Sequence, residues 1–122
     1  MTAPISPVPE ILLVEDDEGT RLAFRKMLEN AGFLVRATGD YQDALNILAG
    51  DTRVDVLITD IVMSHGINGF ALGRMGRMRR RDLKIVYVTA YDVPSHEAVG
   101  PVLRKPVPPE TLIAEIRKAI DG

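Results

Sequence analysis

Reactive side chains lie at the ends of several apolar runs in this sequence. Four runs end, in chain order, in Glu15-Asp16-Asp17, in Asp60, in Thr89 and in Lys105. In open α/β folds, ligands bind outside the carboxyl ends of the parallel strands. If the four runs are strands of one parallel sheet, acids, a hydroxyl and an amine converge on Asp60. That carboxylate is the candidate nucleophile or metal ligand around which the other groups are arranged.

The acidic residues of this group need a compensating positive charge, because several carboxylates in one cleft repel one another. A hard divalent cation supplies it, and Mg²⁺ typically uses one or two carboxylates together with waters and phosphate oxygens. Lys105 adds an ammonium group and Thr89 a hydroxyl donor. A cation, an ammonium and a hydroxyl around one free carboxylate are typical of phosphoryl transfer, in which Asp60 would form an acyl phosphate.

The hydrophobic pattern predicts the alternating elements that would position these groups. Strands are predicted at residues 10–14, 34–38, 54–59, 84–89 and 102–104. The first is a nearly continuous apolar run, as expected of a strand that is buried on both faces of a parallel sheet. The alternation with helical segments indicates an α/β fold, a doubly wound five-stranded parallel sheet with right-handed crossovers and helices on both faces.

Capping residues and apolar spacing predict the helices between these strands. Asp17 and Asp40 are the predicted N-caps of the first two helices, which end at Gly32 and Gly50. The apolar residues assigned to inward faces are Leu22, Phe24, Met27, Leu28 and Ala31 in the first helix, Ala44, Leu45, Ile47 and Leu48 in the second, Phe70, Leu72, Met75 and Met78 in the third, and Leu112, Ile113, Ile116 and Ile120 in the last, which Pro108 and Pro109 open. Residues 90–101 have weak periodicity, so a helix there is shortened or missing.

The composition is that of an ordinary globular domain and excludes several classes of function. The chain has 122 residues, a length sufficient for one domain with its own core. Of these residues 46% are apolar and 26% are charged, as is usual for a globular domain. A net charge of −2 gives no electrostatic basis for binding nucleic acid or anionic membranes. No apolar run approaches the ~20 residues of a membrane helix, and a sequence without Cys has no disulfide or thiolate chemistry. Residues 1–9 are predicted to be an extended tail rather than a signal peptide, and the predicted location is the cytoplasm.

The motifs at the strand ends resemble those of the receiver domain of two-component response regulators. The resemblance covers Glu10 to Ile120. It consists of ILLVEDD (Ile11–Asp17), LITDIVM (Leu57–Met63), VTAY (Val88–Tyr91) and RKP (Arg104–Pro106), in the family's order. Each motif alone is weak, whereas the four together on alternating strands and helices are specific. The resemblance implies a flavodoxin-like fold of the receiver type over residues 10–122.

The resemblance also implies a role for each acidic residue of the site. Asp60 would accept a phosphoryl group from a histidine kinase or a histidine phosphotransfer protein, and would also be a ligand of Mg²⁺. Asp16 would bind Mg²⁺ directly, Glu15 would bind it through water, and Val62 would contribute its backbone carbonyl. Asp17 is expected to cap the first helix rather than to bind metal.

The switch and phosphate-binding residues are matched in the same way. Thr89 matches the family's switch hydroxyl. Lys105 matches its phosphate-binding lysine, which a cis peptide bond usually joins to the next proline, here Pro106. The family's switch aromatic, three residues before this lysine, is replaced by Val102, which leaves Tyr91 as the candidate substitute.

Three further departures separate this chain from the family pattern. The loop at residues 63–69 lacks the usual proline after Met63 and is one residue longer than usual. Too few residues lie between Thr89 and Lys105 for a full fourth helix. No output domain follows the last predicted helix, so a separate protein is expected to recognise the phosphorylated state.

Two positions of the site predict that the phosphoryl group is lost slowly. In the family, the side chains two residues after the phosphoacceptor and two residues after the switch hydroxyl control the access of water to the acyl phosphate. Here they are Val62 and Tyr91, and neither side chain orients water well.

The other polar residues and the methionines are given structural interpretations. Residues 77–81, which are rich in arginine, are interpreted as a solvated helix end that the helix dipole favours, with kinase docking as the alternative. His65 and His96 are interpreted as plain surface residues. The methionines on helical faces are interpreted as core filling.

The sequence therefore predicts a single-domain response regulator, a Mg²⁺-dependent phosphoacceptor that catalyses its own phosphorylation and dephosphorylation but is not otherwise an enzyme. Its phosphorylated state would be recognised by a protein partner that the sequence does not identify, or the domain would serve as a phosphate sink. One alternative is a degenerate receiver that binds a partner without phosphorylation. The altered loop and Val102 favour this alternative, whereas the intact acid pair, Thr89 and Lys105 oppose it. A small aspartate-nucleophile phosphatase ranks low, because it needs a second acid at the position of Val62.

Overall fold

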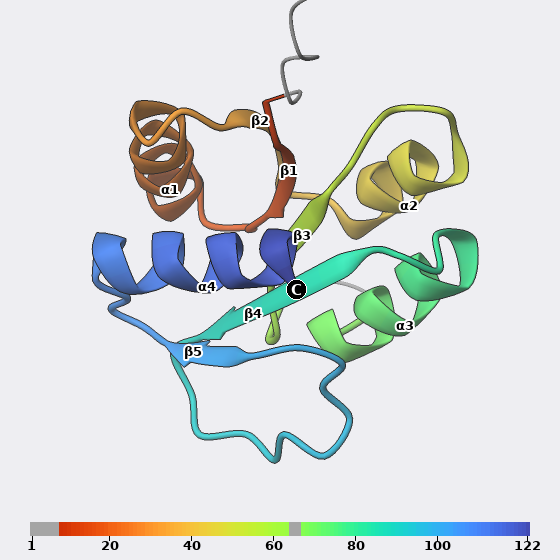
Figure 1. Cartoon of the computed structure of the whole chain (residues 1–122). Coiled ribbons are helices and arrows are strands. Elements are labelled where there is room, and N and C mark those ends of the chain that lie inside the picture. Colours follow the sequence, from red (N-terminus) through yellow and green to blue (C-terminus); the bar gives the residue numbers. More distant parts are fainter. Residues whose placement is uncertain (1–7, 64–66) are drawn as a thin grey trace, which may run out of the picture.

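A five-stranded parallel sheet forms the centre of the molecule (Figure 1). The computed structural model describes residues 8–63 and 67–122. The strands are β1 (Glu10–Val14), β2 (Leu34–Thr38), β3 (Val56–Asp60), β4 (Lys84–Thr89) and β5 (Val102–Arg104). Their order is β2-β1-β3-β4-β5, and all neighbours are parallel. The order changes direction between β1 and β3, and in open α/β sheets ligands bind at such a switch point.

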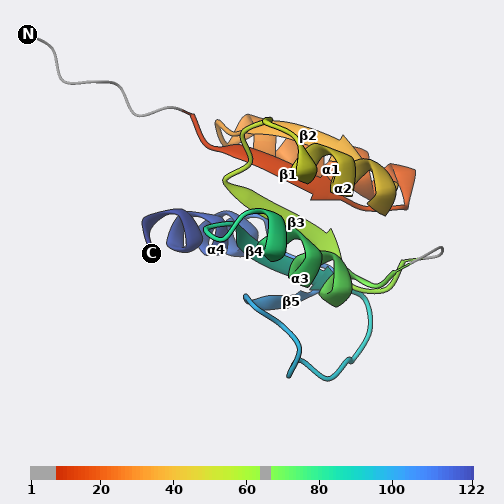
Figure 2. The same ribbon diagram turned by 90° about the vertical axis from the view of Figure 1, so that its right-hand side faces the viewer.

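Four helices cover the two faces of this sheet. They are α1 (Glu18–Asn30), α2 (Tyr41–Ala49), α3 (Gly69–Arg79) and α4 (Pro109–Asp121). α1 and α4 pack on one face, and α2 and α3 pack on the other, toward the viewer in Figure 2. The predicted doubly wound α/β fold is confirmed. Within residues 8–63 and 67–122, no helix has the length and apolarity needed to cross a membrane.

The strand residues divide between two cores, because successive side chains of a strand point to opposite faces. In β1, Ile11 and Leu13 belong to the core beneath α1 and α4, whereas Leu12 and Val14 belong to the core beneath α2 and α3. All five residues of β3 are buried. The third strand begins two residues later than predicted and extends to Asp60, so the sheet itself carries this carboxylate to its edge.

The predicted helix caps are present in the structure. The Asp17 side chain accepts a hydrogen bond from the Thr20 backbone N–H at 2.8 Å, and Asp40 caps α2 by accepting one from the Gln42 N–H at 2.9 Å. These contacts satisfy N–H groups that have no partner inside the helix. Gly32 follows the end of α1 with a φ of 99°, a conformation that glycine adopts without steric cost.

Several residues assigned to inward helix faces are exposed instead. The exposed fraction is 81% for Met78, 39% for Met75 and 57% for Leu22. The interpretation of the α3 methionines as core filling is therefore wrong. Gly73 of α3 is buried instead, and a Cβ atom there would lie 2.4 Å from the Tyr87 hydroxyl oxygen. A large side chain of β4 fills the space that a helix side chain normally occupies.

The segment that joins β4 to β5, residues 90–101, contains no helix, as predicted. All of its residues are described, and they form an irregular loop at the β5 edge of the sheet (Figure 1). Two arginines of α3 bind it. Arg74 pairs with Glu97 at 2.6 Å, and Arg77 donates to the Val99 carbonyl at 3.3 Å. The segment is thus attached to α3 through side chains rather than through a packed helix.

The interpretation of residues 77–81 as a solvated helix end is wrong for two of the arginines. Arg80 donates to the carbonyls of Leu48, Ile47 and Gly50 at 3.0–3.1 Å, and so satisfies the carboxyl end of α2. The Arg77 Nε donates to the Leu83 carbonyl at 2.8 Å. Carbonyls at the end of a helix lack partners inside it, which makes them good acceptors for a guanidinium. Arg79 and Arg81 are exposed, as the interpretation requires.

Two sequence predictions concern residues outside the described ranges. Most of the predicted tail, residues 1–7, lies there, and so do residues 64–66 of the longer loop, which include His65. Of the two histidines, His96 is described and is exposed, as predicted.

Candidate functional site

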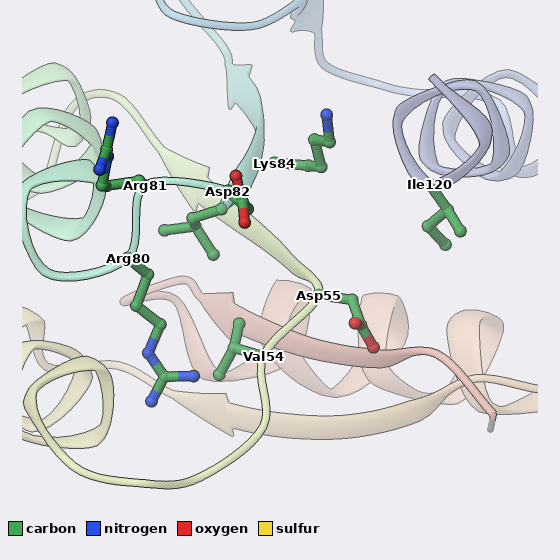
Figure 3. Close-up of a pocket in the computed structure, with 8 residues that line it drawn as sticks. Val54, Asp55, Arg80, Arg81, Asp82, Lys84 and Ile120 are labelled. Atoms are coloured by element: carbon green, nitrogen blue, oxygen red, sulfur yellow. The ribbon is translucent and has the colours of Figure 1, made fainter.

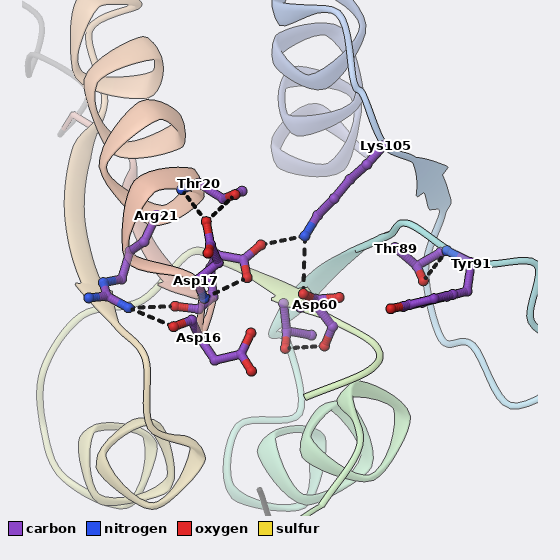
Figure 4. Close-up of polar contacts among 10 residues, drawn as sticks. Asp16, Asp17, Thr20, Arg21, Asp60, Thr89, Tyr91 and Lys105 are labelled. Carbon is purple, nitrogen blue, oxygen red and sulfur yellow. Dashed lines mark hydrogen bonds and ion pairs between the residues drawn. The ribbon is translucent and has the colours of Figure 1, made fainter. Parts of the chain in front are cut away.

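The carboxyl ends of β1 and β3 bring the predicted acids together (Figure 4). The two strands are in register up to Val14 and Thr59, so the next residues, Glu15 and Asp60, lie at the same edge of the sheet. Glu15 is fully buried and Asp60 is 6% exposed. Glu15, Asp16 and Asp60 each offer one carboxylate oxygen, and these oxygens lie within 4.8 Å of one another. Asp17, the α1 cap, is outside this cluster, as predicted.

Lys105 joins two of these acids through its ammonium group. The Nζ atom donates to Glu15 Oε1 at 2.5 Å and to Asp60 Oδ2 at 3.1 Å (Figure 4). The side chain extends from the end of β5, where the Lys105 backbone N–H donates to the Thr89 carbonyl at 2.8 Å. The Lys105–Pro106 peptide bond is cis, as the family resemblance implied.

Burial and hydrogen bonding act in opposite directions on the charges of this cluster. Burial raises the pKa of Glu15, and the hydrogen bonds from Lys105 and from the Asp17 N–H only partly offset this effect. Burial alone would lower the pKa of Lys105, but its bonds to Glu15 and Asp60 outweigh burial, so that its pKa lies above the ordinary value. The site therefore holds a stable ammonium beside Glu15, whose charged form is disfavoured by burial.

Thr89 ends β4, the strand beside β3, and is almost fully buried. Asp60 is in register with Val88 of β4. Thr89, the next residue of β4, therefore lies one position further along the sheet than Asp60. Its hydroxyl oxygen accepts a hydrogen bond from the Tyr91 backbone N–H at 3.1 Å. Thr89, Tyr91 and Val102 line one surface pocket, and the Tyr91 side chain is 59% exposed. Val102, at the position of the family's switch aromatic, and its candidate substitute Tyr91 thus line the same pocket as Thr89.

Val62 lies in the loop after β3 and is exposed. With Met63, Phe70 and Val93 it lines a shallow, largely apolar groove between that loop and the segment that joins β4 to β5. An apolar side chain at this position fits the expectation that water is poorly oriented near Asp60. The role of the Val62 carbonyl as a metal ligand stays a prediction.

The contacts of two arginines near the site were not predicted from the sequence. Arg21 of α1 donates through Nη1 to the carbonyls of Glu15 and Asp16 (Figure 4). Arg104 pairs with Asp92 and donates through Nε to the Ala90 carbonyl at 3.1 Å. Arg104 belongs to the RKP motif but was given no role of its own, and Arg21 belongs to none of the four motifs. The position of Arg21 one helical turn after the cap residue Asp17 was the available signal.

Another surface pocket lies at the opposite end of the strands (Figure 3). Asp55, Arg80, Arg81 and Lys84 contribute to its lining. Lys84 begins β4, whereas the acid cluster lies where β3 and β4 end. Asp55 already accepts a hydrogen bond from the Glu10 backbone N–H and pairs with an arginine, so the pocket presents no group of free acids.

Comparison with known proteins agrees with the fold and the acid cluster. Residues 11–117 match the family model of the response regulator receiver domain. The chain is 33% identical over 113 residues to the response regulator MprA of Mycolicibacterium vanbaalenii, an alignment that covers 88% of this chain and 48% of MprA. The chain thus spans about half the length of the curated relatives it matches.

Solved structures with the same fold extend this comparison. A response regulator receiver protein from Sinorhizobium medicae superposes with a TM-score of 0.83 at 26% identity, covering 94% of this chain and 96% of that one. The response regulator TrrA of Thermotoga maritima, solved in complex with Mg²⁺ and BeF, has a TM-score of 0.79 at 26% identity, covering 92% and 99%. Together with the sheet order and the acid cluster at its switch point, these matches show that the chain belongs to the family of response regulator receiver domains of two-component systems.

Proposed function

We propose that Asp60 accepts a phosphoryl group from a phosphohistidine of a histidine kinase or a histidine phosphotransfer protein, in a reaction that requires Mg²⁺. The observation that carries this proposal is the contact of Lys105 with both Glu15 and Asp60, which places a cation against the candidate nucleophile. The family supports the same chemistry, because receiver domains interact with such histidine proteins.

The donor set of the site fits Mg²⁺. Glu15, Asp16 and Asp60 offer three carboxylate oxygens close together, and Mg²⁺ prefers hard oxygen ligands. We assign these three residues, with the carbonyl of Val62, as the groups that hold the ion directly or through water. When bound, Mg²⁺ neutralises the charge of the transferring phosphoryl group. The solved TrrA structure contains Mg²⁺ with BeF, which is consistent with this assignment.

The residues of the chain perform the remaining steps of the proposed transfer. A carboxylate oxygen of Asp60 forms a bond to phosphorus while the phosphorus–nitrogen bond of the donor breaks, and the bonding pair stays with the departing imidazole nitrogen. Lys105 donates hydrogen bonds to a phosphoryl oxygen, and the Thr89 hydroxyl donates to another. Catalysis is then mostly positioning and charge neutralisation, which is characteristic of phosphoryl transfer.

The phosphorylated state would act through the surface next to Thr89. Its hydroxyl oxygen accepts the Tyr91 N–H, so a new bond from Thr89 to the phosphoryl group changes the start of the segment that joins β4 to β5. Added charge-assisted contacts of this kind bias a two-state surface. A partner protein would bind the changed surface, or the domain would hold phosphate that returns to its kinase. A cytoplasmic location remains part of this proposal.

Beryllofluoride binding tests the site without covalent chemistry. The experiment records amide NMR spectra of the full chain with beryllofluoride, in the presence and absence of Mg²⁺. We expect shifts at Asp60, Thr89 and Lys105 that require Mg²⁺ and are absent in Asp60→Asn. Asp82→Asn, an exposed acid far from the cluster, is the matched control and should respond like the natural chain. A folded protein that shows no response would favour the degenerate receiver, which binds partners without phosphorylation.

A further inference from the structure

We infer that Arg21 is a positioning residue for the Mg²⁺ site, and that Gly39 is required to leave space for its guanidinium. The inference rests on the proposed function, because it concerns the loop that carries Glu15 and Asp16. Arg21 contacts this loop through the backbone carbonyls of Glu15 and Asp16. Its effect would be transmitted through the backbone of these two residues.

Arg21 binds backbone carbonyls of the acid loop, residues 15–17, which follow β1. Its Nη1 donates to the Glu15 carbonyl at 2.8 Å and approaches the Asp16 carbonyl at 3.5 Å. The ladder between β1 and β2 ends at Val14 and Thr38, so these two carbonyls lie beyond the last strand pair. Partly buried carbonyls need a donor, and hydrogen bonds from a charged group are stronger than neutral ones.

The other sides of the same loop are already fixed by different groups. Lys105 holds the Glu15 carboxylate, and the Asp17 N–H also donates to it at 3.2 Å. The Asp17 side chain is tied to Thr20 as the cap of α1. Arg21 thus binds the backbone of the acid loop, while Lys105 and the Asp17 N–H bind the Glu15 side chain. Without Arg21, the Asp16 carboxylate would lie in its binding position for less of the time.

Gly39 provides an independent observation that points to the same role. Its backbone does not require glycine, because Gly32 is the one described glycine with a positive φ. A Cβ atom at position 39 would lie 2.6 Å from Arg21 Nη1 and 3.4 Å from the Glu15 carbonyl oxygen. The clash is with the end of a flexible side chain, so Gly39→Ala would displace the guanidinium rather than unfold the chain. A small residue at position 39 is thus explained by the position of Arg21.

The sign of the effect separates positioning from simple electrostatics. The guanidinium carries a positive charge beside a cation site, so its Coulombic effect opposes Mg²⁺ binding. If charge were its main effect, Arg21→Met would strengthen Mg²⁺ binding. If it positions the loop, the same substitution weakens binding, because the free loop must be ordered when the ion binds. Residues that orient metal ligands typically change affinity by about 10–100-fold when they are replaced.

The test measures the Mg²⁺ dissociation constant of the unphosphorylated full chain by NMR titration. Arg21→Met and Gly39→Ala are compared with the double variant and with Arg25→Met, an exposed arginine of the same helix. We expect each single variant to weaken binding about tenfold. The double variant should be no weaker than Arg21→Met, since both changes remove the same contact. Arg25→Met should bind like the natural chain, and Arg21→Lys should recover part of the affinity.

Unchanged or tighter binding in Arg21→Met would overturn the inference, and so would additive effects in the double variant. If Arg21→Met does not fold, Gly39→Ala alone decides, because it keeps the arginine and its charge but displaces the guanidinium. A natural chain that binds neither Mg²⁺ nor beryllofluoride would overturn the proposed function and this inference with it. A natural chain that binds both, with normal Mg²⁺ affinity in Gly39→Ala, overturns this inference alone.

Discussion

Lys105 and Glu15, which are 90 positions apart in the sequence, form a 2.5 Å ion pair at the switch point of the sheet. The pair joins the last strand to the first, and the Lys105 ammonium also contacts Asp60, which ends the central strand β3. One cation thus connects the three parts of the chain that carry the proposed chemistry. Its removal would leave Glu15 and Asp60 without this counter-charge, so the stability of the site would then depend on another cation.

Lys105→Met should therefore make the stability of the domain depend on Mg²⁺. Removing one partner of a buried pair leaves the other charge uncompensated. We expect the free energy of unfolding to fall by about 2 kcal/mol in the absence of Mg²⁺, allowing for the partial exposure of the lysine. Saturating Mg²⁺ should restore much of this loss, because it neutralises the same acids. Denaturant unfolding with EDTA and with Mg²⁺ measures both values. An equal loss in the two conditions would contradict the assignment of the acids to a shared cation site.

Tyr87 should make the domain sensitive to alkaline pH. Burial raises the pKa of its hydroxyl, which the hydrogen bond from the Val99 N–H only partly offsets. The folded-state pKa is above the unfolded one. The neutral phenol therefore contributes stability that is complete below the unfolded pKa of about 10 and is lost as pH rises through the folded value.

Tyr87→Phe tests this pH dependence. At neutral pH the variant should be less stable by about 1 kcal/mol, since it lacks the hydrogen bond. As pH rises above about 10, the natural chain should lose stability that the variant keeps, so the difference narrows or reverses. Urea unfolding across this pH range measures the difference. A difference that stays constant across the range would show that the phenol does not titrate in the way described.

The segment that joins β4 to β5 should be intolerant of a side chain at Gly100. A Cβ atom there would lie 1.9 Å from the Ile85 carbonyl oxygen, which is backbone of the central sheet and has little room to move. We expect Gly100→Ala to destabilise the fold by about 1–3 kcal/mol. Gly19→Ala is the matched control, because its Cβ would meet no atom closer than 3.6 Å, and it should be neutral or slightly stabilising. Thermal unfolding distinguishes the two, and equal stability of both variants would contradict the close packing of the segment.

Val62 and Tyr91 predict a long-lived phosphorylated state. The exposed apolar Val62 gives water no hydrogen-bonding partner near Asp60, and the ring of Tyr91 adds bulk beside Thr89. The lifetime in Mg²⁺, followed by intact mass after removal of the donor, should exceed several minutes. Val62→Asn should shorten it, because the amide can orient a water molecule. Loss of phosphate from the natural chain within seconds to a minute would show that the hypothesis is wrong.

The fold could be predicted because the order of apolar runs, caps and helical segments agreed with the tertiary structure. Asp17 and Asp40 mark the starts of α1 and α2, and a short apolar run such as β3 is typical of a strand that is buried on both faces. The convergence of Glu15, Asp60 and Lys105 followed from the rule that parallel strands present their carboxyl ends at one edge. The sheet order then placed these residues in contact.

The features that could not be predicted depend on pairs of residues that are distant in the sequence. The periodicity of α3 assigned Met78 to the core, but Tyr87 from β4 occupies the space over Gly73, so the helix packs with its glycines inward. Arg80 resembles any other residue of an arginine-rich helix end until α2 is placed beside it. The role of Arg21 likewise appears only when Gly39 is seen next to its guanidinium.

The most direct test of the central claim is phosphorylation by acetyl phosphate, followed by intact mass of the full chain. Four samples are compared: the natural chain with Mg²⁺, the natural chain with EDTA, Asp60→Asn with Mg²⁺, and Asp82→Asn with Mg²⁺. The account predicts a mass increase of one phosphoryl group in the first and last samples only. A phosphoryl group that appears in Asp60→Asn or without Mg²⁺, or a folded natural chain that gains none, would contradict the assignment of Asp60 as a Mg²⁺-dependent phosphoacceptor.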